Sequence, residues 1–252
     1  MAKFGPLTIV SLVREVRAGT GSHRPIVVAG ASELVPLLAK ELRRGGDPFA
    51  VLEAGRPQDG AVLVWIGKPD EAALRAASRA HVPIVGVTEG ESLPYVLDTN
   101  LVFVEPGEGM PVEAVARKIA AVLGELATGL AARLPVVREA VVDQLIRSFS
   151  RRNALVGAAA WIPGADLPVL TLNQIRLVLR IALAHGEDVD ASRAPELLGV
   201  VGAGFGLRTL ARELLDFVPV AGWIVKGAVA YAGTRAIGEA ASQYFGSVRP
   251  RS

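Results

Sequence analysis

A small group of residues has the right chemistry to hold a phosphate or another polar ligand at the ends of predicted strands. Each follows a short apolar run, and ligands of parallel sheets bind beyond the carboxyl ends of such strands. A glycine lets a loop approach a ligand, an amine neutralises its charge, and a hydroxyl donates a hydrogen bond. A nonstandard nucleotide-sensing or catalytic site is therefore one alternative for this chain. The group consists of Gly30, Ser32, Lys68 and Thr88.

The usual phosphate-binding loop is missing at the place where it would be needed. After the first apolar run the chain reads Gly-Ala-Ser-Glu-Leu over residues 30–34, without a Gly-Lys-Ser sequence. Nothing there neutralises a β-phosphate, no hydroxyl is placed to reach magnesium, and Glu33 would repel a phosphate. The run 83–89 also lacks the guanine-reading Asn-Lys-x-Asp motif. These absences favour a structural or partner-docking role for this part of the chain.

Two further patterns imitate functional motifs. The stretch 200–207 resembles a dinucleotide fingerprint, but Leu207 stands where the third glycine belongs and a predicted helix precedes it. Close helix packing explains its glycines better. The histidines His23, His81 and His185 lie in separate segments without a second ligand at metal spacing. We therefore expect no metal and no cofactor, find no catalytic constellation, and favour a chain that is not an enzyme.

The elements that would position these residues alternate between short apolar runs and amphipathic helices. This pattern predicts a small, doubly wound, mostly parallel sheet that is covered on both faces. A helix over 7–18 precedes it; we expect this helix to dock on its own domain, with a membrane-surface helix as the alternative. The predicted strands are Ile26–Ala29, Phe49–Leu52, Ala61–Ile66, Pro83–Val87 and Leu101–Val104, and the predicted helices among them are 33–44, 70–80 and 112–126.

The second half, from about Leu134, is predicted to be all helical. The stretch 153–175 has one charged residue, Asp166. An aspartate at about +2.5 to +3.5 kcal/mol, with two prolines, offsets the insertion gain of the apolar residues, so we expect buried helices over 155–162 and 172–184. A membrane-inserted hairpin around Asp166 remains a second alternative. The turn between the two helices is a structural landmark formed by Pro163, Gly164, Asp166 and Pro168.

The last predicted helix, 221–244, is dense in glycine and alanine. Small residues let helix backbones approach closely, and Lys226, Arg235 and Glu239 favour a soluble or interfacial bundle over a lipid-embedded one. A break at Leu134-Pro135 separates the two halves of the chain. The other helices predicted in this half are 137–149, 196–203 and 207–215.

Composition and charge exclude several classes of protein. The chain of 252 residues has no cysteine, which excludes disulfides and sulfur-ligated zinc. From residue 128 onward it has 14 basic and 10 acidic side chains, against 13 and 15 before. An unclustered excess of this size is no nucleic-acid footprint, although it suits an anionic membrane surface. The beginning lacks a signal-peptide pattern, so we expect a cytoplasmic protein or a peripheral one at the inner face of the membrane.

A set of glycines, prolines and helix-packing residues in the second half forms a recognisable series. Its members are Asn153-Ala154, the turn 162–168, Leu172-Asn173-Gln174-Ile175-Arg176, His185-Gly186, 204–208 and 218–222. Over about residues 150–245 this series resembles the YcjF-type domain of unknown function. In that family the helical domain commonly follows an Era-like or dynamin-like GTPase domain and is thought to be membrane-associated. The resemblance implies a degenerate GTPase-like, Rossmann-like α/β domain over 1–130 and a YcjF-type helical domain over 131–252.

The functional expectation follows from this arrangement. We expect a non-enzymatic scaffold or a membrane-associated pseudo-GTPase-like protein. Its expected partners are a second copy of itself, another protein or an anionic membrane surface, and no nucleic acid. No catalytic residue follows from the resemblance, because the matching positions hold glycines, prolines and helix-packing residues.

Overall fold

The structure is a computed structural model that describes residues 6–20, 24–53, 55–105, 107, 109–159, 167–190 and 223–247. The chain divides into two compact units. Residues 20–144 form the α/β unit, and residues 1–19 together with 145–252 form the helical unit. The predicted fold class, an α/β domain followed by helices, is confirmed.

The α/β unit contains a five-stranded, all-parallel sheet with the order β2-β1-β3-β4-β5. All five predicted strands are present, with ends shifted by one or two residues. The strand order reverses between β1 and β3, which makes their carboxyl ends the topological switch point. The strands are β1 (Ile26–Gly30), β2 (Val51–Glu53), β3 (Val62–Ile66), β4 (Ile84–Thr88) and β5 (Leu101–Phe103).

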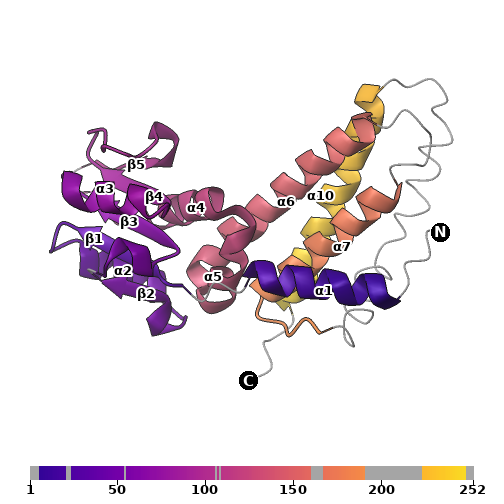
Figure 1. The fold of residues 1–252 in the computed structure, drawn as a ribbon, viewed down its shortest axis with the longest axis horizontal. Coiled ribbons are helices and arrows are strands. Elements are labelled where there is room, and N and C mark those ends of the chain that lie inside the picture. Colours follow the sequence, from indigo (N-terminus) through magenta and orange to yellow (C-terminus); the bar gives the residue numbers. More distant parts are fainter. Residues whose placement is uncertain are drawn as a thin grey trace. The chain divides into compact units, whose positions relative to one another are not determined.

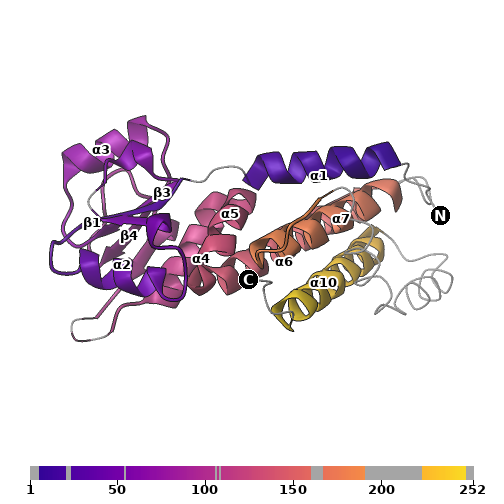
Figure 2. The same cartoon turned by 90° about the horizontal axis from the view of Figure 1, so that it is seen from below.

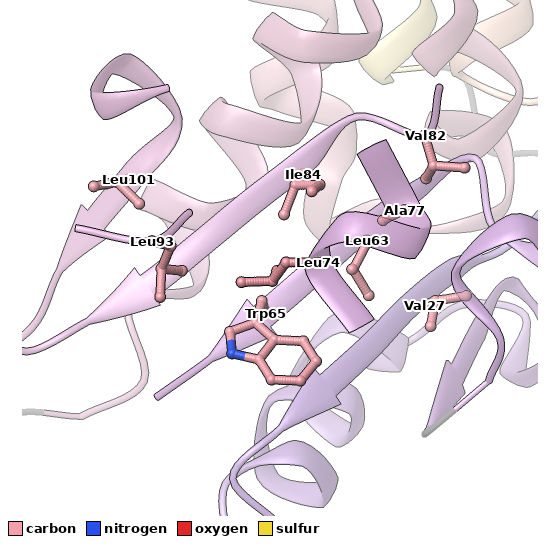
Figure 3. Close-up of a cluster of buried hydrophobic side chains, with 9 residues drawn as sticks. All are labelled: Val27, Leu63, Trp65, Leu74, Ala77, Val82, Ile84, Leu93 and Leu101. Atoms are coloured by element: carbon pink, nitrogen blue, oxygen red, sulfur yellow. The ribbon is translucent and has the colours of Figure 1, made fainter. Parts of the chain in front are cut away.

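Helices cover both faces of this sheet. Helix α3 (Glu71–Arg79) packs on one face, and α2 (Val35–Arg43) and α4 (Val112–Leu123) contact the strands and each other. Every residue of β3 is buried, as expected for a parallel strand between two layers. The core of the α3 face is shown in Figure 3 and consists of Val27, Leu63, Trp65, Leu74, Ala77, Val82, Ile84, Leu93 and Leu101.

Within the described residues, four helices belong wholly or partly to the helical unit. Helices α6 (Pro135–Ala159), α7 (Leu167–Ala184) and α10 (Trp223–Ser247) lie alongside one another (Figures 1 and 2). Helix α1 (Pro6–Thr20) joins them. The predicted break at Leu134 is present, since this residue separates α6 from the short helix α5 (Thr128–Arg133).

The observed division of the chain differs from the expected boundary between residues 130 and 131. Helix α1 belongs to the helical unit, and α6 runs through the place where the two units divide. The reason for the first difference lies in the contacts of α1. Its apolar face, Leu12, Val13 and Val16, is buried, and Glu15 forms an ion pair with Arg176 of α7. Helix α1 therefore packs in the helical unit, and not, as expected, in the domain whose strands follow it in the sequence.

The helix predicted over 155–162 is not a separate buried element. Helix α6 continues through Ala159, because no proline follows Phe149 within it and Gly157 remains helical. Leu155 is 72% exposed, while Asn153 and Gly157 take the inner positions. The predicted end of α7 is confirmed, since Gly186 follows it with φ +84°.

Several sequence-based expectations fall on parts of the chain outside the described residues. They are the helices 196–203 and 207–215, the glycines of 200–207, His23, and Pro163, Gly164 and Asp166 of the turn. Pro168 is described and lies in the first turn of α7, a position that needs no backbone N–H donor. Of the helices within the described ranges, none is both long and apolar enough to cross a membrane.

Candidate functional site

The four residues of the suggested ligand site lie at one edge of the sheet. Gly30 ends β1, Ser32 follows it, Lys68 follows β3, and Thr88 ends β4. Because these strands are parallel neighbours, their carboxyl ends meet at the same edge. These residues therefore lie in one region of the α/β unit: Gly30, Ser32 and Lys68 lie at the topological switch point between β1 and β3, and Thr88 lies one strand further along the edge.

Gly30 has a packing role at this edge. Its φ is +121°, and a Cβ atom at this position would lie 2.0 Å from the carbonyl oxygen of Ile66. The amide of Ala31 donates to the same oxygen over 2.9 Å. Any side chain at position 30 would collide with the backbone of β3. The close pairing of β1 with β3 is therefore sufficient to explain the glycine.

The polar groups at this edge are engaged in their own turns. The Thr88 hydroxyl donates to the carbonyl of Glu91 over 2.8 Å and accepts from the amide of Gly90 at 3.1 Å. At the start of α3, Asp70 Oδ1 accepts from the amides of Ala72 and Ala73 at 2.9 and 3.1 Å. A phosphate at this helix would have to displace a carboxylate that already caps it.

The start of α2 offers little more to an anion. The amides of Leu34 and Val35 both donate to the carbonyl of Ala31 over 3.0 Å, and Pro36 has no N–H. Fixed negative charge also surrounds this edge of the sheet, which opposes phosphate binding. The described parts of the loops after β1, β3, β4 and β5 contain one amine, Lys68, and five carboxylates, those of Glu33, Asp70, Glu89, Glu91 and Glu105.

A continuous polar network occupies the interior of the helical unit. Asn173 Nδ2 of α7 donates to Asn153 Oδ1 of α6 over 2.8 Å. Asn153 Nδ2 in turn donates to the hydroxyl of Thr234 in α10 over 2.8 Å. Gln174 Nε2 also approaches the Thr234 oxygen at 3.4 Å. Asn153, Asn173 and Thr234 are all buried, so the bonds between them are shielded from water.

The network reaches the surface through an arginine. Arg176 Nη1 donates to Asn173 Oδ1 over 3.3 Å. Its Nε and Nη2 donate to the two carboxylate oxygens of Glu15 over 3.0 and 2.9 Å. This is the two-bonded geometry that suits a guanidinium and a carboxylate. The network, defined as Glu15, Arg176, Asn173, Asn153, Thr234 and Gln174, thus joins helices α1, α7, α6 and α10.

Small residues bring α6 and α10 together on either side of this network. A Cβ atom at Gly227 would lie 3.0 Å from the carbonyl oxygen of Ala154, and one at Gly157 would lie 3.1 Å from that of Lys226. A Cβ atom at Gly238 would lie 2.7 Å from Ile146 Cγ1. Higher positions in α6 face lower positions in α10, so the two helices are antiparallel. The close approach expected for the last helix is therefore present.

The groups of the network are suited to holding helices in position and not to catalysis. Its buried members are amides and a hydroxyl, which neither titrate near neutral pH nor act as nucleophiles without an adjacent base. They can fix the axial positions of three helices, α6, α7 and α10, relative to one another. Ser150, also buried on α6, has a hydroxyl oxygen without a hydrogen-bond partner in the described residues.

The described histidines contribute no metal centre. His81 lies in the turn after α3 with φ +55°, and His185 lies in the turn after α7, 6.5 Å from the ring of Phe245. Among the residues that the structure describes, no three potential ligands gather in one place. At Asp47, the amide of Phe49 and the guanidinium of Arg133 lower the pKa of the carboxyl.

Sequence reasoning named part of the network without recognising it. Asn153, Asn173, Gln174 and Arg176 belong to the series that resembles the YcjF-type domain, but Glu15 and Thr234 were missed. A signal for Thr234 exists in its spacing, because it lies seven residues after Gly227 and four before Gly238, on one face of α10. Compared with protein-family models and with curated proteins, the sequence matches none.

Proposed function

We propose that this chain is a non-enzymatic scaffold, in which the α/β unit offers a docking surface and the helical unit associates with an anionic membrane surface or with a second copy. The observation that carries the proposal is the buried network of Asn153, Asn173 and Thr234. It ties three helices together through groups that hold position and perform no acid–base chemistry. A helical unit built in this way is suited to presenting a surface.

The α/β unit supports the docking role through its exposed apolar side chains. Phe49 precedes the edge strand β2, and Phe103 ends the opposite edge strand β5; both are largely exposed, as is Leu97. Edge strands with exposed aromatic residues are common sites of protein association. At the sheet's carboxyl edge, by contrast, Thr88 and Asp70 are already engaged by neighbouring backbone groups.

The resemblance to the YcjF-type domain extends this proposal to a pseudo-GTPase arrangement. In that arrangement the α/β unit keeps the parallel sheet of a nucleotide-binding domain but uses it for docking. The chain would then act at the cytoplasmic face of the inner membrane, with the helical unit held peripherally. The missing Gly-Lys-Ser sequence after β1 and the acidic loops at the sheet edge support this view.

Calorimetric titration with a panel of guanine and adenine nucleotides tests the non-enzymatic part of the proposal. We expect no heat of binding at micromolar nucleotide. Binding that is lost on Ser32→Ala or Lys68→Ala, and kept on the matched changes Ser78→Ala and Lys118→Ala elsewhere in the unit, would overturn it in favour of the nonstandard nucleotide site.

Light scattering and vesicle flotation of the full chain test the scaffold part. We expect either a stable oligomer or co-flotation with anionic vesicles. A monomer that ignores vesicles would contradict the proposal. Extraction that requires detergent, even from carbonate-washed membranes, would instead indicate the inserted hairpin around Asp166.

A further inference from the structure

The two edge strands of the sheet differ in how their backbone groups are engaged. At β2, Arg43 of α2 donates from Nε and Nη2 to the carbonyl oxygen of Val51 over 3.2 and 2.8 Å. Its Nη1 donates to Glu53 Oε1 over 2.6 Å. A charged side chain that lies along an edge strand in this way hinders pairing with another chain. The β2 edge is therefore closed by its own chain.

The edge strand β5 is open by comparison. The Val104 amide donates to the Thr88 carbonyl oxygen over 2.9 Å, so Val104 faces β4. Because alternate residues of a strand direct their backbone groups to opposite sides, Phe103 directs its N–H and C=O away from the sheet. In the described residues, no side chain donates to the backbone of β5 and no strand lies beyond it. This edge therefore presents a donor and an acceptor at Phe103.

The side chain of Phe103 makes the same edge apolar. It is 60% exposed, although Leu101, two positions earlier on the same face of β5, is buried in the core. An exposed aromatic residue beside outward-facing backbone groups marks a place where a further strand can be added. Which chain supplies that strand depends on the charges at this edge.

Two oppositely charged side chains lie at the β5 edge. Glu105 follows Phe103 and is exposed. Lys118 of α4 lies toward the other end of β5, where its Nζ donates to the carbonyl oxygen of Thr99 over 2.5 Å. In the described part of the α/β unit, neither Glu105 nor Lys118 has an ion-pair partner. The edge thus has a negative group after Phe103 and a positive group before it.

This arrangement is complementary to itself. In an antiparallel pairing about a two-fold axis at Phe103, each Phe103 N–H donates to the Phe103 carbonyl of the other copy. Glu105 of one copy then stands opposite Leu101 of the other, two positions from Thr99 and the Lys118 amine bound to it. Opposite charges meet twice, once on each side of the axis. A strand of another protein would have to supply both charges itself.

We infer that the edge of β5 pairs with the same edge of a second copy, so that two five-stranded sheets continue into one another. The two Phe103 side chains would lie opposite each other on one face, where cross-strand aromatic pairs are stabilising. The pairing spans residues 101–105 of each copy, so the dimer is weak and reversible. Because the β2 edge is closed, association stops at two copies. This inference rests on the docking role proposed for the α/β unit and names its partner.

Sedimentation equilibrium of the full chain across a wide concentration range tests the inference. We expect an equilibrium between monomer and dimer. Phe103→Asp should weaken the dimer at least about tenfold, because two like charges would then meet at the axis. Phe49→Asp is the matched control, since it makes the same change at an even more exposed phenylalanine beside the closed β2 edge. It should leave the dimer unchanged, and circular dichroism confirms that each variant is folded.

Mixing two charge variants tests the two-fold geometry directly. Glu105→Lys alone places amines against amines on both sides of the axis, and Lys118→Glu alone places carboxylates against carboxylates. Each variant should therefore dimerise at least about tenfold more weakly than the unchanged chain. In an equal mixture, one copy of each variant restores both attractive contacts, so we expect a heterodimer about as stable as the original dimer. Arg117→Glu, at the neighbouring exposed cation of α4, should leave the dimer unchanged.

The outcomes separate this inference from the broader proposal. A dimer that Phe103→Asp leaves intact, or charge variants that do not pair in the mixture, would overturn the inference, while a scaffold that binds a second copy through another surface stands. A chain that is monomeric at submillimolar concentration would also overturn it, as expected if the edge binds a strand of a different protein. The scaffold then stands if the chain floats with anionic vesicles. A monomer that does not float overturns both.

Discussion

The two units fix the register of neighbouring elements in different ways. In the α/β unit, backbone hydrogen bonds join adjacent strands and place Val27 beside Leu52 on one side and Leu63 on the other. Its core cluster is accordingly hydrophobic throughout. Each helix of the other unit satisfies its backbone internally. Side chains such as Asn153 and Asn173 therefore fix the positions of the helices, where no backbone pairing joins one element to the next.

We expect the largest loss of stability from a change that disrupts the pairing of two strands in the α/β unit. Gly30→Ala would press a methyl group against the carbonyl of Ile66, at a backbone conformation that side chains rarely adopt. We expect a loss of roughly 3 to 5 kcal/mol in the free energy of unfolding, from overpacking and backbone strain together. Urea denaturation followed by circular dichroism measures it.

Gly90 provides the matched control for this change. It has nearly the same φ, +118°, but a Cβ atom there would meet nothing within 4 Å. Gly90→Ala should therefore show only the conformational part, about 1 kcal/mol. Similar losses for the two variants would mean that the approach of β1 to β3 is not what requires Gly30.

The next effect tests the network. Asn153→Ala removes the acceptor of Asn173 Nδ2 and the closer of the two donors to Thr234 Oγ1 inside the helical unit. Leaving buried polar groups unpaired should lower the free energy of unfolding by about 2 to 3 kcal/mol. Thermal denaturation measures the loss. Asn100→Ala, at a half-buried site outside the helical unit, should change little.

A second variant tests whether the network fixes the positions of the helices along one another, independently of its contribution to stability. Replacing the three buried members together, by Asn153→Leu, Asn173→Leu and Thr234→Val, removes their polar groups at once, so that none of the three is left without its partner. We expect stability near that of the unchanged chain but broadened amide resonances from several helix registers. Sharp, single resonances in this variant would show that the glycine contacts alone define the packing.

The same comparison explains what could be predicted from the sequence. The strands are local features, short apolar runs between turns, and all five were found. The network joins Asn153 to Thr234 across 81 positions, and spacing along a helix does not say which other helix its polar residue faces. Likewise, the pattern of α1 predicts an apolar face, Leu12, Val13 and Val16, but not the unit that buries it. The suggested residues at the sheet edge were placed together because parallel topology alone determines that edge.

A smaller effect separates two glycines of α10. A Cβ atom added at Gly227 would lie 3.0 Å from the carbonyl oxygen of Ala154. A Cβ atom added at Gly233 would have no atom within 4 Å. Gly233→Ala should stabilise the chain by about 0.5 to 1 kcal/mol, because alanine favours the helix. Gly227→Ala should destabilise it by about 1 kcal/mol, because α6 and α10 must separate. Thermal denaturation of both variants gives the two signs, and a gain at Gly227 would contradict the close crossing.

The smallest effect concerns a polar contact inside the α/β unit, at a place where no strand pairing acts. Asp47 Oδ2 accepts from Arg133 Nε over 2.9 Å and so holds the loop after α2 to the end of α5. The Phe49 amide and Arg133 lower the pKa of Asp47. A lowered pKa in the folded state stabilises the fold above the unfolded value of about 4, and this contribution is lost as pH falls through the folded pKa.

Asp47→Asn should therefore be less stable than the unchanged chain at neutral pH, and the difference should shrink as the pH falls below about 4. Urea midpoints across this range measure the effect, with Asp98→Asn as a control that removes one exposed carboxylate from the same unit. A difference that stayed constant with pH would show that the carboxylate charge is not what joins the loop to α5. A difference that shrinks would show that the α/β unit also uses a polar side-chain contact where no strand pairing joins two elements. The charged pair of Asp47 and Arg133 would then stabilise the contact between the loop after α2 and the end of α5.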